Sequence, residues 1–294
     1  MRVLAIFGPT AVGKTGVAIA VAEALRKRGE DPVAVNCDSI QVYRGLETLS
    51  GAASGEERSC LEHRLLSFVE PSVEFSAGRY AELAHAEIDG LLEEGRRPIV
   101  VGGAGLYLRA ALSDLDLRPP VPAGVREGVE REIAQRGPEA LHAELAPELA
   151  DGVHPNDRKR IARLTELSRT GIEAHGGTKG LWAAKLRRPT LLLGLVMNRE
   201  ELARRIDRRV DAMVAASARE EVERADRERV SRTARSALGF EQLLADDTEG
   251  MKAAHRAYAR RQLTWMRRME GVDLIDRADR SDEEVAAEIV RRLD

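Results

Sequence analysis

The sequence feature that most constrains the fold is a glycine-rich segment near the amino terminus. Residues Gly8–Thr15 (GPTAVGKT) fit the pattern G-x-x-x-x-G-K-[ST] without a mismatch, directly after an apolar run, Val3–Phe7. They open a stretch of helical character that extends to about Arg28. In this context glycines let backbone N–H groups face one anion, the lysine adds a cation and the Thr hydroxyl can ligate Mg²⁺. The segment predicts a polyphosphate-binding loop between a strand and a helix.

Apolar runs alternate with helical stretches along most of the chain. Pro32–Asn36 and Pro98–Val101 have the character of short buried strands, and Ala77–Glu94 has helical spacing. Later, Thr190–Met197 and Val272–Ile275 return to the strand pattern. Strand, helix and strand in under forty residues require a parallel crossover. We therefore expect an α/β protein with a P-loop NTPase-like parallel sheet core flanked by helices.

The alternation stops between residues 116 and 185. Pro119, Pro120 and Pro122 break the pattern, and the polar stretch that follows is helical in character with no convincing strand. We expect an inserted all-helical domain here, with the core formed by residues 1–115 and 186–294. Trp182 and Phe240 are expected to pack in hydrophobic cores.

Composition limits the class of protein. The chain has 294 residues, 43% of them hydrophobic and 32% charged, which excludes collagen-like, mucin-like and wholly disordered chains. The first residues contain only five consecutive apolar positions before a Gly-Pro break, too few for a signal-peptide core, and no apolar run is long enough to cross a bilayer. Two cysteines cannot form a disulfide framework. We expect a cytoplasmic protein.

The basic charge lies in the second half of the chain. Residues 1–150 carry 16 Lys or Arg against 23 Asp or Glu, whereas residues 151–294 carry 30 against 26. From Lys252 to Arg268 there are six basic residues and no acidic one, with Tyr258 and Trp265 among them. Such a run can bind nucleic-acid phosphates or form a solvated helix face, and the sequence alone leaves both open.

Asp38 is the main candidate for proton transfer. It follows the second predicted strand, and the carboxyl ends of parallel strands are where open α/β sheets bind ligands. It can act as a general base, or it can instead hold Mg²⁺ through water or cap the next helix, and the sequence does not favour the base over these other two roles. Cys37 is expected to pack rather than to act as a nucleophile. His154 is expected in a turn rather than at a metal.

The order of these and further segments resembles the tRNA dimethylallyltransferase family. The resemblance extends from Ile6 to Arg268, nearly the whole chain, and several segments are specific to this family and its close relatives. The segments are GPTAVGKT, DSIQVYRGLE, HRLLSFVEP (His63–Pro71), FSAGRY (Phe75–Tyr80), GGAGLYLRAAL (Gly102–Leu112), HPNDRKRIAR (His154–Arg163), NREELARRIDRRVDAM (Asn198–Met213), ALGFEQLL (Ala237–Leu244) and RAYARRQLTWMRR (Arg256–Arg268).

The resemblance implies transfer of a dimethylallyl group from its diphosphate to N6 of the adenosine 3′-adjacent to the tRNA anticodon. Asp38 matches the general base of the family, and Lys14 and Thr15, with Mg²⁺ on Thr15, match the groups that hold the departing diphosphate. A monomer is expected, because one chain can contact both substrates. The implied diphosphate-binding residues are Gly8, Pro9, Thr10, Ala11, Val12, Gly13, Lys14, Thr15, Gly103 and Ala104, and the implied tRNA-binding residues are Ser39, Gln41, Tyr43, Arg44, Arg158, Lys159, Arg160, Arg163, Arg260, Arg261, Gln262 and Trp265.

Two positions depart from the family pattern. Ala104 stands where the family usually carries Thr, and the segment Gly51–Ser54 lacks the usual Lys. Loss of one hydrogen bond to a charged group costs about 1.5–3 kcal/mol. We therefore expect weaker binding of the prenyl donor or slower transfer. The alternatives are an adenylate isopentenyltransferase acting on free AMP, ADP or ATP, a P-loop small-molecule kinase, and an RNA-binding relative without catalysis. The basic helical segments argue against the first of these.

Overall fold

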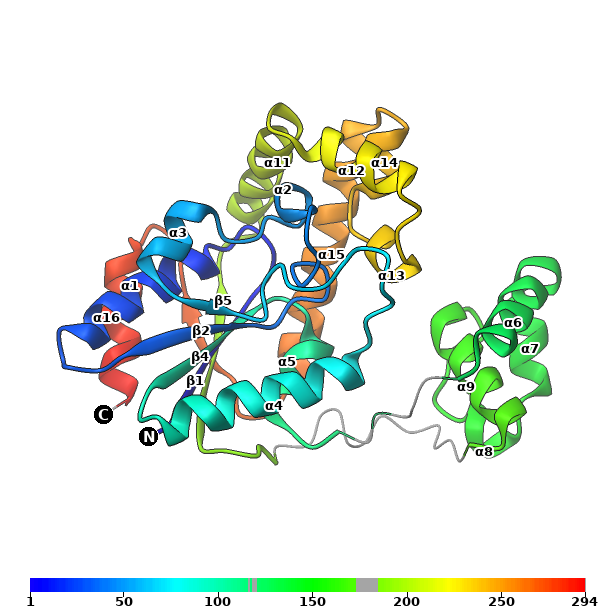
Figure 1. Ribbon diagram of the computed structural model, residues 1–294, viewed down its shortest axis with the longest axis horizontal. Coiled ribbons are helices and arrows are strands. Elements are labelled where there is room, and N and C mark those ends of the chain that lie inside the picture. Colours follow the sequence, from blue (N-terminus) through cyan, green and yellow to red (C-terminus); the bar gives the residue numbers. More distant parts are fainter. Residues whose placement is uncertain (116, 118–120, 173–184, 294) are drawn as a thin grey trace. The chain divides into compact units, whose positions relative to one another are not determined.

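The computed structural model describes residues 1–115, 117, 121–172 and 185–293. The chain divides into two compact units. The larger unit comprises Met1–Asp114 and Ala184–Asp294, and the smaller unit comprises Leu115–Ala183. Figure 1 shows the elements of each unit, coloured along the chain.

The centre of the larger unit is a parallel sheet. Among the described residues it has six strands in the order β3-β2-β4-β1-β5-β6. The phosphate-loop strand lies inside it, with Phe7 opposite Gly102 on one side and Gly194 on the other. The strands are β1 (Val3–Phe7), β2 (Pro32–Asn36), β3 (His63–Arg64), β4 (Arg97–Gly102), β5 (Thr190–Val196) and β6 (Asp273–Asp276).

Helices cover both faces of this sheet because its strands are apolar on both sides. Leu4 and Ile6 belong to a core shared with α1 (Lys14–Arg26) and α16 (Asp282–Leu293). Val3 points to the other face, where it lies near residues of α4 (Ala77–Glu93) and α5 (Gly105–Leu112). Such two-sided burial is typical of parallel sheets. The remaining helices of the unit are α2 (Glu47–Ser50), α3 (Gly55–Cys60), α11 (Arg199–Ala215), α12 (Ala218–Arg227), α13 (Arg232–Arg235), α14 (Phe240–Leu244) and α15 (Thr248–Arg268).

The described part of the smaller unit is helical. It contains α6 (Ala123–Arg136), α7 (Pro138–Glu144), α8 (Pro147–Ala150) and α9 (Arg158–Thr170). These helices have their own hydrophobic core, in which Val129, Leu141 and Ile161 are fully buried. The smaller unit thus has a core of its own.

The predicted α/β core with a helical insertion is confirmed. Predicted strand and helix ends differ from the observed ones by one or two residues. The strand β3 was not predicted, because a two-residue edge strand leaves almost no periodic signal.

Phe240 is fully buried, as predicted, whereas Pro119, Pro120 and Trp182 lie outside the described residues. No helix in the described ranges has the length and apolar character to cross a membrane.

Candidate functional site

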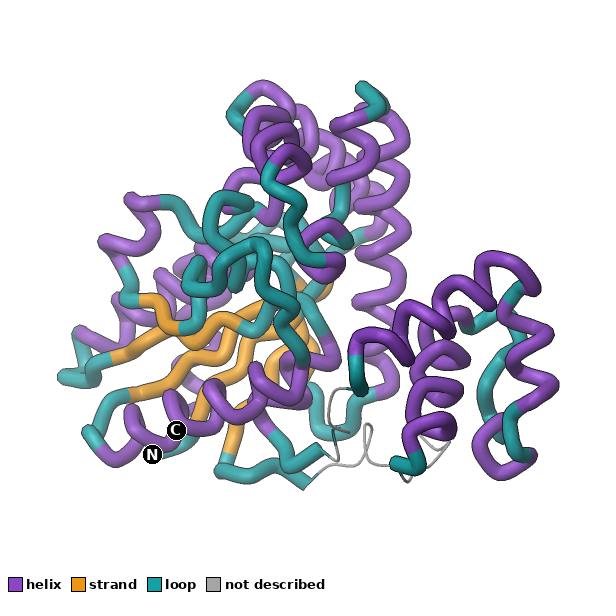
Figure 2. Tube along the Cα trace, turned by 45° about the vertical axis from the view of Figure 1, so that its right-hand side comes forward, coloured by secondary structure: helices purple, strands orange, loops and turns teal. Residues whose placement is uncertain are grey.

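The loops after three neighbouring strands meet at one edge of the sheet. β1 pairs with β4, and β4 pairs with β2, all in parallel, so their carboxyl ends lie together (Figure 2). The phosphate loop follows β1, Asp38 follows β2, and Gly103 and Ala104 follow β4. The fold therefore brings the predicted anion-binding residues and the predicted base to the same edge.

The phosphate loop has the backbone that its sequence predicts. Ala11 and Gly13 have positive φ angles of 65° and 95°, and Gly13 caps the amino terminus of α1. The Lys14 ammonium donates to the carbonyl oxygens of Gly8 at 3.0 Å and Pro9 at 2.9 Å. Burial and, secondarily, the Arg209 charge lower the pKa of Lys14 to about 8, although Asp38 opposes this shift. The lysine thus folds over the loop, where it can pair with an anion.

Asp38 is half-buried and fixes the turn that follows β2. Its Oδ1 accepts hydrogen bonds from the backbone N–H groups of Ile40 at 2.9 Å and Gln41 at 3.4 Å. The preceding strand end is held by Tyr80, whose hydroxyl donates to the carbonyl oxygen of Asn36 at 2.9 Å. Asp38 therefore caps a turn and not the next helix, since α2 begins only at Glu47 and has Leu46 as its N-cap. Because both capping bonds go to Oδ1, that role leaves Oδ2 for other chemistry.

Cys37 is packed in the interior, as predicted. Its side chain is fully buried, and burial raises the pKa of the thiol well above its ordinary value. A thiol that stays protonated is a poor nucleophile. A Cβ on Gly102 would lie 2.5 Å from the Cys37 carbonyl oxygen, which explains the glycine at this crossing of β2 and β4.

Gln262 of α15 joins the two anion-binding loops. Its Oε1 accepts from the backbone N–H of Thr10 at 2.8 Å, and its Nε2 donates to the carbonyl oxygen of Gly103 at 2.7 Å. A Cβ on Gly103 would lie 2.2 Å from that Nε2, so only glycine allows the approach. The sequence analysis placed Gln262 among the tRNA contacts. The structure instead buries it to 4% exposure, with both ends of its amide used by the protein.

Ala104 occupies the N-cap position of α5. Its side chain provides no capping hydrogen bond. Ser or Thr at such a position usually accepts a bond from the first turn of the helix. The departure from the family pattern therefore removes a helix cap in addition to a hydroxyl near the anion-binding loop.

Arg209 is a site residue that the sequence analysis missed. From α11 it donates to the carbonyl oxygens of Ser50 at 3.4 Å and Gly51 at 3.2 Å, while its Nε is buried without a hydrogen-bond partner among the described residues. Burial lowers the pKa of Arg209, and the Asp38 charge opposes this. One signal was present: position 209 lies three residues after Ile206, on the buried stripe of the helix. A half-buried arginine whose charge acts on Lys14, and which is itself affected by the Asp38 charge, is suited to bind an anion.

The residues after Asp38 that were predicted to bind the tRNA lie in different environments. Tyr43 is fully buried, and its hydroxyl donates to the carbonyl oxygen of Val73 at 3.1 Å. Gln41 donates to the carbonyl oxygens of Ser50 at 3.3 Å and Gly51 at 3.1 Å. Arg44 is exposed and forms an ion pair with Glu70 at 2.7 Å, while Ser39 is half-buried. Tyr43, fully buried, and Gln41, half-buried, therefore both bond to backbone carbonyl oxygens of neighbouring loops.

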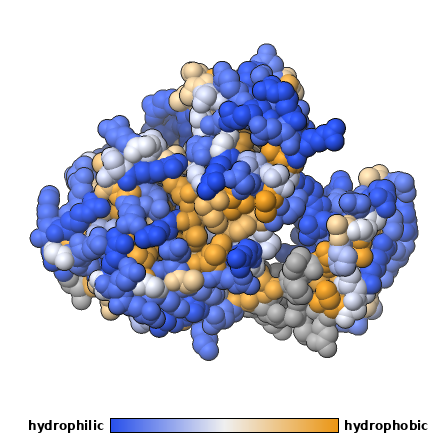
Figure 3. All heavy atoms as spheres, in the orientation of Figure 1, coloured by the Kyte–Doolittle hydropathy of each residue, from blue (hydrophilic) through white to orange (hydrophobic). Residues whose placement is uncertain are grey.

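The carboxyl-terminal half of α15 carries predicted tRNA-binding residues on its surface. Arg260 and Arg261 are exposed, and the Arg261 guanidinium lies 5.5 Å from the centre of the Tyr258 ring. Trp265 is half-buried and covers Gly105, where an added Cβ would lie 2.4 Å from the indole ring. Figure 3 shows one face of the larger unit, on which hydrophobic residues gather in the middle with hydrophilic ones around them.

In the smaller unit the predicted basic residues sit at the start of α9. Lys159 is exposed, whereas three arginines have acidic neighbours. His154 forms a turn as expected, with its Nδ1 accepting from the N–H of Asn156 at 3.1 Å. The ion pairs are Arg158–Glu130 at 3.0 Å, Arg160–Asp157 at 3.7 Å and Arg163–Glu166 at 3.2 Å.

Comparison with known proteins places this geometry in context. Residues 41–269 match the family model described as IPP transferase. The tRNA dimethylallyltransferase of Anaeromyxobacter dehalogenans is 38% identical over 291 residues, which cover 92% of each chain, and that of Thermobifida fusca is 38% identical over 300 residues, covering 94% of this chain and 92% of the relative.

Solved structures similar to this chain also include tRNA-modifying transferases. The tRNA isopentenylpyrophosphate transferase of Bacillus halodurans superposes with a TM-score of 0.72 at 29% identity, covering 99% of this chain and 95% of that one. A eukaryotic dimethylallyltransferase acting on tRNA superposes with a TM-score of 0.72 at 25% identity, covering 95% of this chain and 74% of that one.

Proposed function

The chain belongs to the IPP transferase family, and we propose that, like the relatives it matches, it transfers a dimethylallyl group from dimethylallyl diphosphate to tRNA. The acceptor that we propose is N6 of the adenosine 3′-adjacent to the anticodon, and diphosphate is the leaving group. The observation that carries the proposal is the meeting of a phosphate loop, a carboxylate and a half-buried arginine at one edge of the sheet.

The phosphate loop binds the diphosphate of the donor. As the bond from the allylic carbon to oxygen breaks, negative charge grows on the leaving group. Lys14 and Arg209 supply fixed positive charge, and the loop N–H groups and the start of α1 supply hydrogen bonds and the helix dipole. Lys14 exchanges its bonds to the Gly8 and Pro9 carbonyls for bonds to the anion.

Asp38 accepts the proton from the acceptor amine. An exocyclic amine is a poor nucleophile, so removal of its proton as the C–N bond forms lowers the barrier, by roughly 10²–10⁴-fold for a general base. The hydrogen bonds from Ile40 and Gln41 hold one carboxylate oxygen, so the other is free to take the proton. The product is the N6-prenylated adenosine, a protonated carboxyl group and free diphosphate.

The donor set of this site fits Mg²⁺. In the described part of the chain no group of three or more His, Cys, Asp or Glu side chains forms a metal cage. Mg²⁺ commonly binds through one or two protein oxygens together with substrate phosphates and water. The Thr15 hydroxyl, at the start of α1, would hold it beside the diphosphate. When bound there, Mg²⁺ would neutralise charge on the leaving group.

The tRNA meets the basic surfaces of both units. We assign Arg260 and Arg261 of α15 and Lys159 of the smaller unit to backbone phosphates, because their side chains are exposed. The arginines of α9 also bind backbone phosphates when the RNA displaces the acidic side chains with which they form ion pairs. Extraction of the target adenine from its stack costs a few kcal/mol, which these phosphate contacts offset. One chain carries both sites, so we propose a monomer that acts in the cytoplasm.

A product assay tests this function. The protein is incubated with Mg²⁺, labelled dimethylallyl diphosphate and either unmodified tRNA or AMP, and the nucleosides are analysed by mass spectrometry. We expect an adenosine heavier by C5H8 in the tRNA reaction and none in the AMP reaction. Prenylated AMP would instead indicate an adenylate isopentenyltransferase. Consumption of ATP without prenyl transfer would indicate a kinase.

A further inference from the structure

The phosphate loop is contacted by Arg277, which lies 265 positions after Val12 in the sequence. Arg277 directly follows β6, and its backbone N–H donates to the carbonyl oxygen of Val196 in the neighbouring strand at 2.8 Å. Its side chain crosses to the loop, where Nε donates to the carbonyl oxygen of Val12 at 3.2 Å. Arg277 is only 7% exposed and lies beyond residues 41–269 that match the family model.

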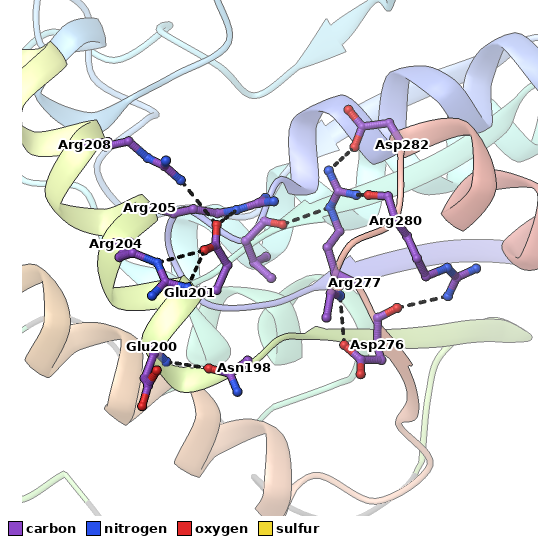
Figure 4. Close-up of polar contacts among 12 residues, drawn as sticks. Asn198, Glu200, Glu201, Arg204, Arg205, Arg208, Asp276, Arg277, Arg280 and Asp282 are labelled. Atoms are coloured by element: carbon purple, nitrogen blue, oxygen red, sulfur yellow. Dashed lines mark hydrogen bonds and ion pairs between the residues drawn. The ribbon is translucent and has the colours of Figure 1, made fainter.

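The guanidinium of Arg277 is held from two further directions. Its Nη1 donates to the carbonyl oxygen of Arg280 at 2.5 Å, and its Nη2 donates to Oδ1 of Asp282 at 2.5 Å. Figure 4 shows the side chain extended between these partners and the loop. With all three nitrogens engaged, the guanidinium has one defined orientation.

Glycines in the loop allow this close approach. A Cβ on Gly13 would lie 3.0 Å from Arg277 Nε, and a Cβ on Gly16 would lie 2.1 Å from Asp282 Oδ2. Gly13 also has a φ of 95°, which other residues rarely adopt. The Arg277–Asp282 pair therefore packs directly against the end of the loop and the first turn of α1.

The bond to Val12 sets the direction of a loop N–H. A trans peptide group is planar, so its C=O and its N–H point to opposite sides. The chain contains no cis peptide bond among its described residues. When Arg277 holds the Val12 carbonyl on its own side, the N–H of Gly13 must point away from Arg277. We propose that Arg277 is a positioning residue, which keeps this N–H directed at the diphosphate.

This inference rests on the proposed function, since it assumes that the loop binds the donor diphosphate. The test compares Arg277→Met with Arg280→Met. Arg280 belongs to the same turn, and its side chain bonds to the carbonyl oxygens of Asp276 and Glu284 rather than to the loop. Binding of pyrophosphate with Mg²⁺ is measured by calorimetry, together with tRNA binding and thermal unfolding, and steady-state kinetics give kcat and the donor KM.

For Arg277→Met we expect pyrophosphate affinity to fall, and the donor KM to rise, by roughly tenfold or more. This is the effect of losing one hydrogen bond to a charged group. The affinity for tRNA should not change. Arg280→Met should bind pyrophosphate within about twofold of the wild type. Equal pyrophosphate affinity in Arg277→Met and wild type, or equal loss in both variants, would overturn the inference.

Two further results keep the test decisive. If Arg277→Met does not fold, Arg277→Lys is tested in its place. One ammonium group keeps the charge but cannot reach all three partners, so this variant must show the same loss of pyrophosphate affinity. If the wild type itself does not bind pyrophosphate, the proposed function fails together with the inference.

Discussion

Asp38 has a structural task in this fold, and we propose that the same carboxylate also has a chemical one. Oδ1 caps the turn at Ile40 and Gln41, so replacement by Ala would remove the cap and the base together. Asp38→Asn keeps a carbonyl oxygen for the cap and removes the base. We expect kcat to fall by roughly 10²–10⁴-fold while tRNA and pyrophosphate affinities stay within about twofold. Asp38→Ala serves as the comparison for lost capping. Full activity of the Asn variant in the prenyl-transfer assay would show that another group takes the proton.

Ala104 offers a gain-of-function test. A Thr hydroxyl at the N-cap of α5 can accept from the first turn, which typically stabilises a protein by about 0.5–2 kcal/mol. We expect Ala104→Thr to raise the melting temperature by a few degrees and to lower the donor KM. Ala104→Val has the same shape without the hydroxyl and should show neither change. An Ala104→Thr protein that melts no higher than the Val variant would argue against the cap.

Lys14 should make anion binding dependent on pH. In the proposed function the ammonium form binds the diphosphate, and burial and the Arg209 charge lower the pKa of Lys14 in the free enzyme to about 8. Raising the pH through 8 removes this proton, so pyrophosphate affinity should fall, by at most about tenfold per pH unit. Below pH 8 the contribution of Lys14 to this affinity should level off.

Lys14→Arg is the control for this pH dependence, because a guanidinium stays protonated throughout the range. Dividing the wild-type affinity by that of Lys14→Arg at each pH removes the effect of the ligand's own ionisation. A ratio that stays flat from pH 7 to pH 10 would contradict the role of the Lys14 charge.

At the scale of the element, we propose that α15 serves the two substrates with different sides. Its exposed side carries Arg260 and Arg261, and its buried side carries Gln262, which bonds to both anion-binding loops. The two sides should be separable by mutation. We expect the double variant Arg260→Glu and Arg261→Glu to lower tRNA affinity by roughly tenfold or more, with the donor KM unchanged.

Gln262→Leu should have the opposite effect. It removes two buried hydrogen bonds, worth about 0.5–1.5 kcal/mol each, so the donor KM should rise by roughly tenfold while tRNA affinity is retained. Filter binding of tRNA and initial rates at varied donor concentration give the two constants. If both variants change the same constant, the division of α15 into two sides is wrong.

The sequence predicted the strands and the phosphate loop well, because each has a strong local signal. Buried apolar runs mark β1, β2, β4 and β5, and the glycine pattern marks the turn into α1. What it could not show is which polar side chains turn inward. Gln262 and Tyr43 belong to segments that looked like RNA contacts, yet tertiary packing buries both. Arg209 is one of several arginines in α11, and only the position of its neighbours distinguishes it.

At the scale of the whole molecule, the site is assembled from distant parts of the chain. Gln262 and Thr10 are 252 positions apart, and Arg277 and Val12 are 265 positions apart. The smaller unit, by contrast, has a core formed within one continuous segment. Such a distribution couples the donor site to the folding of the entire larger unit, whereas the helical insertion can form from local contacts.

The Arg277–Val12 bond also has a consequence for biosynthesis. The ribosome produces the phosphate loop well before Arg277, which lies 265 positions after Val12 and directly follows β6. A nascent chain that still lacks this later segment has the glycine loop but not the arginine that contacts it. If Arg277 orients the loop as we propose, full affinity for the donor arises only after β6 and the residue that follows it have been synthesised.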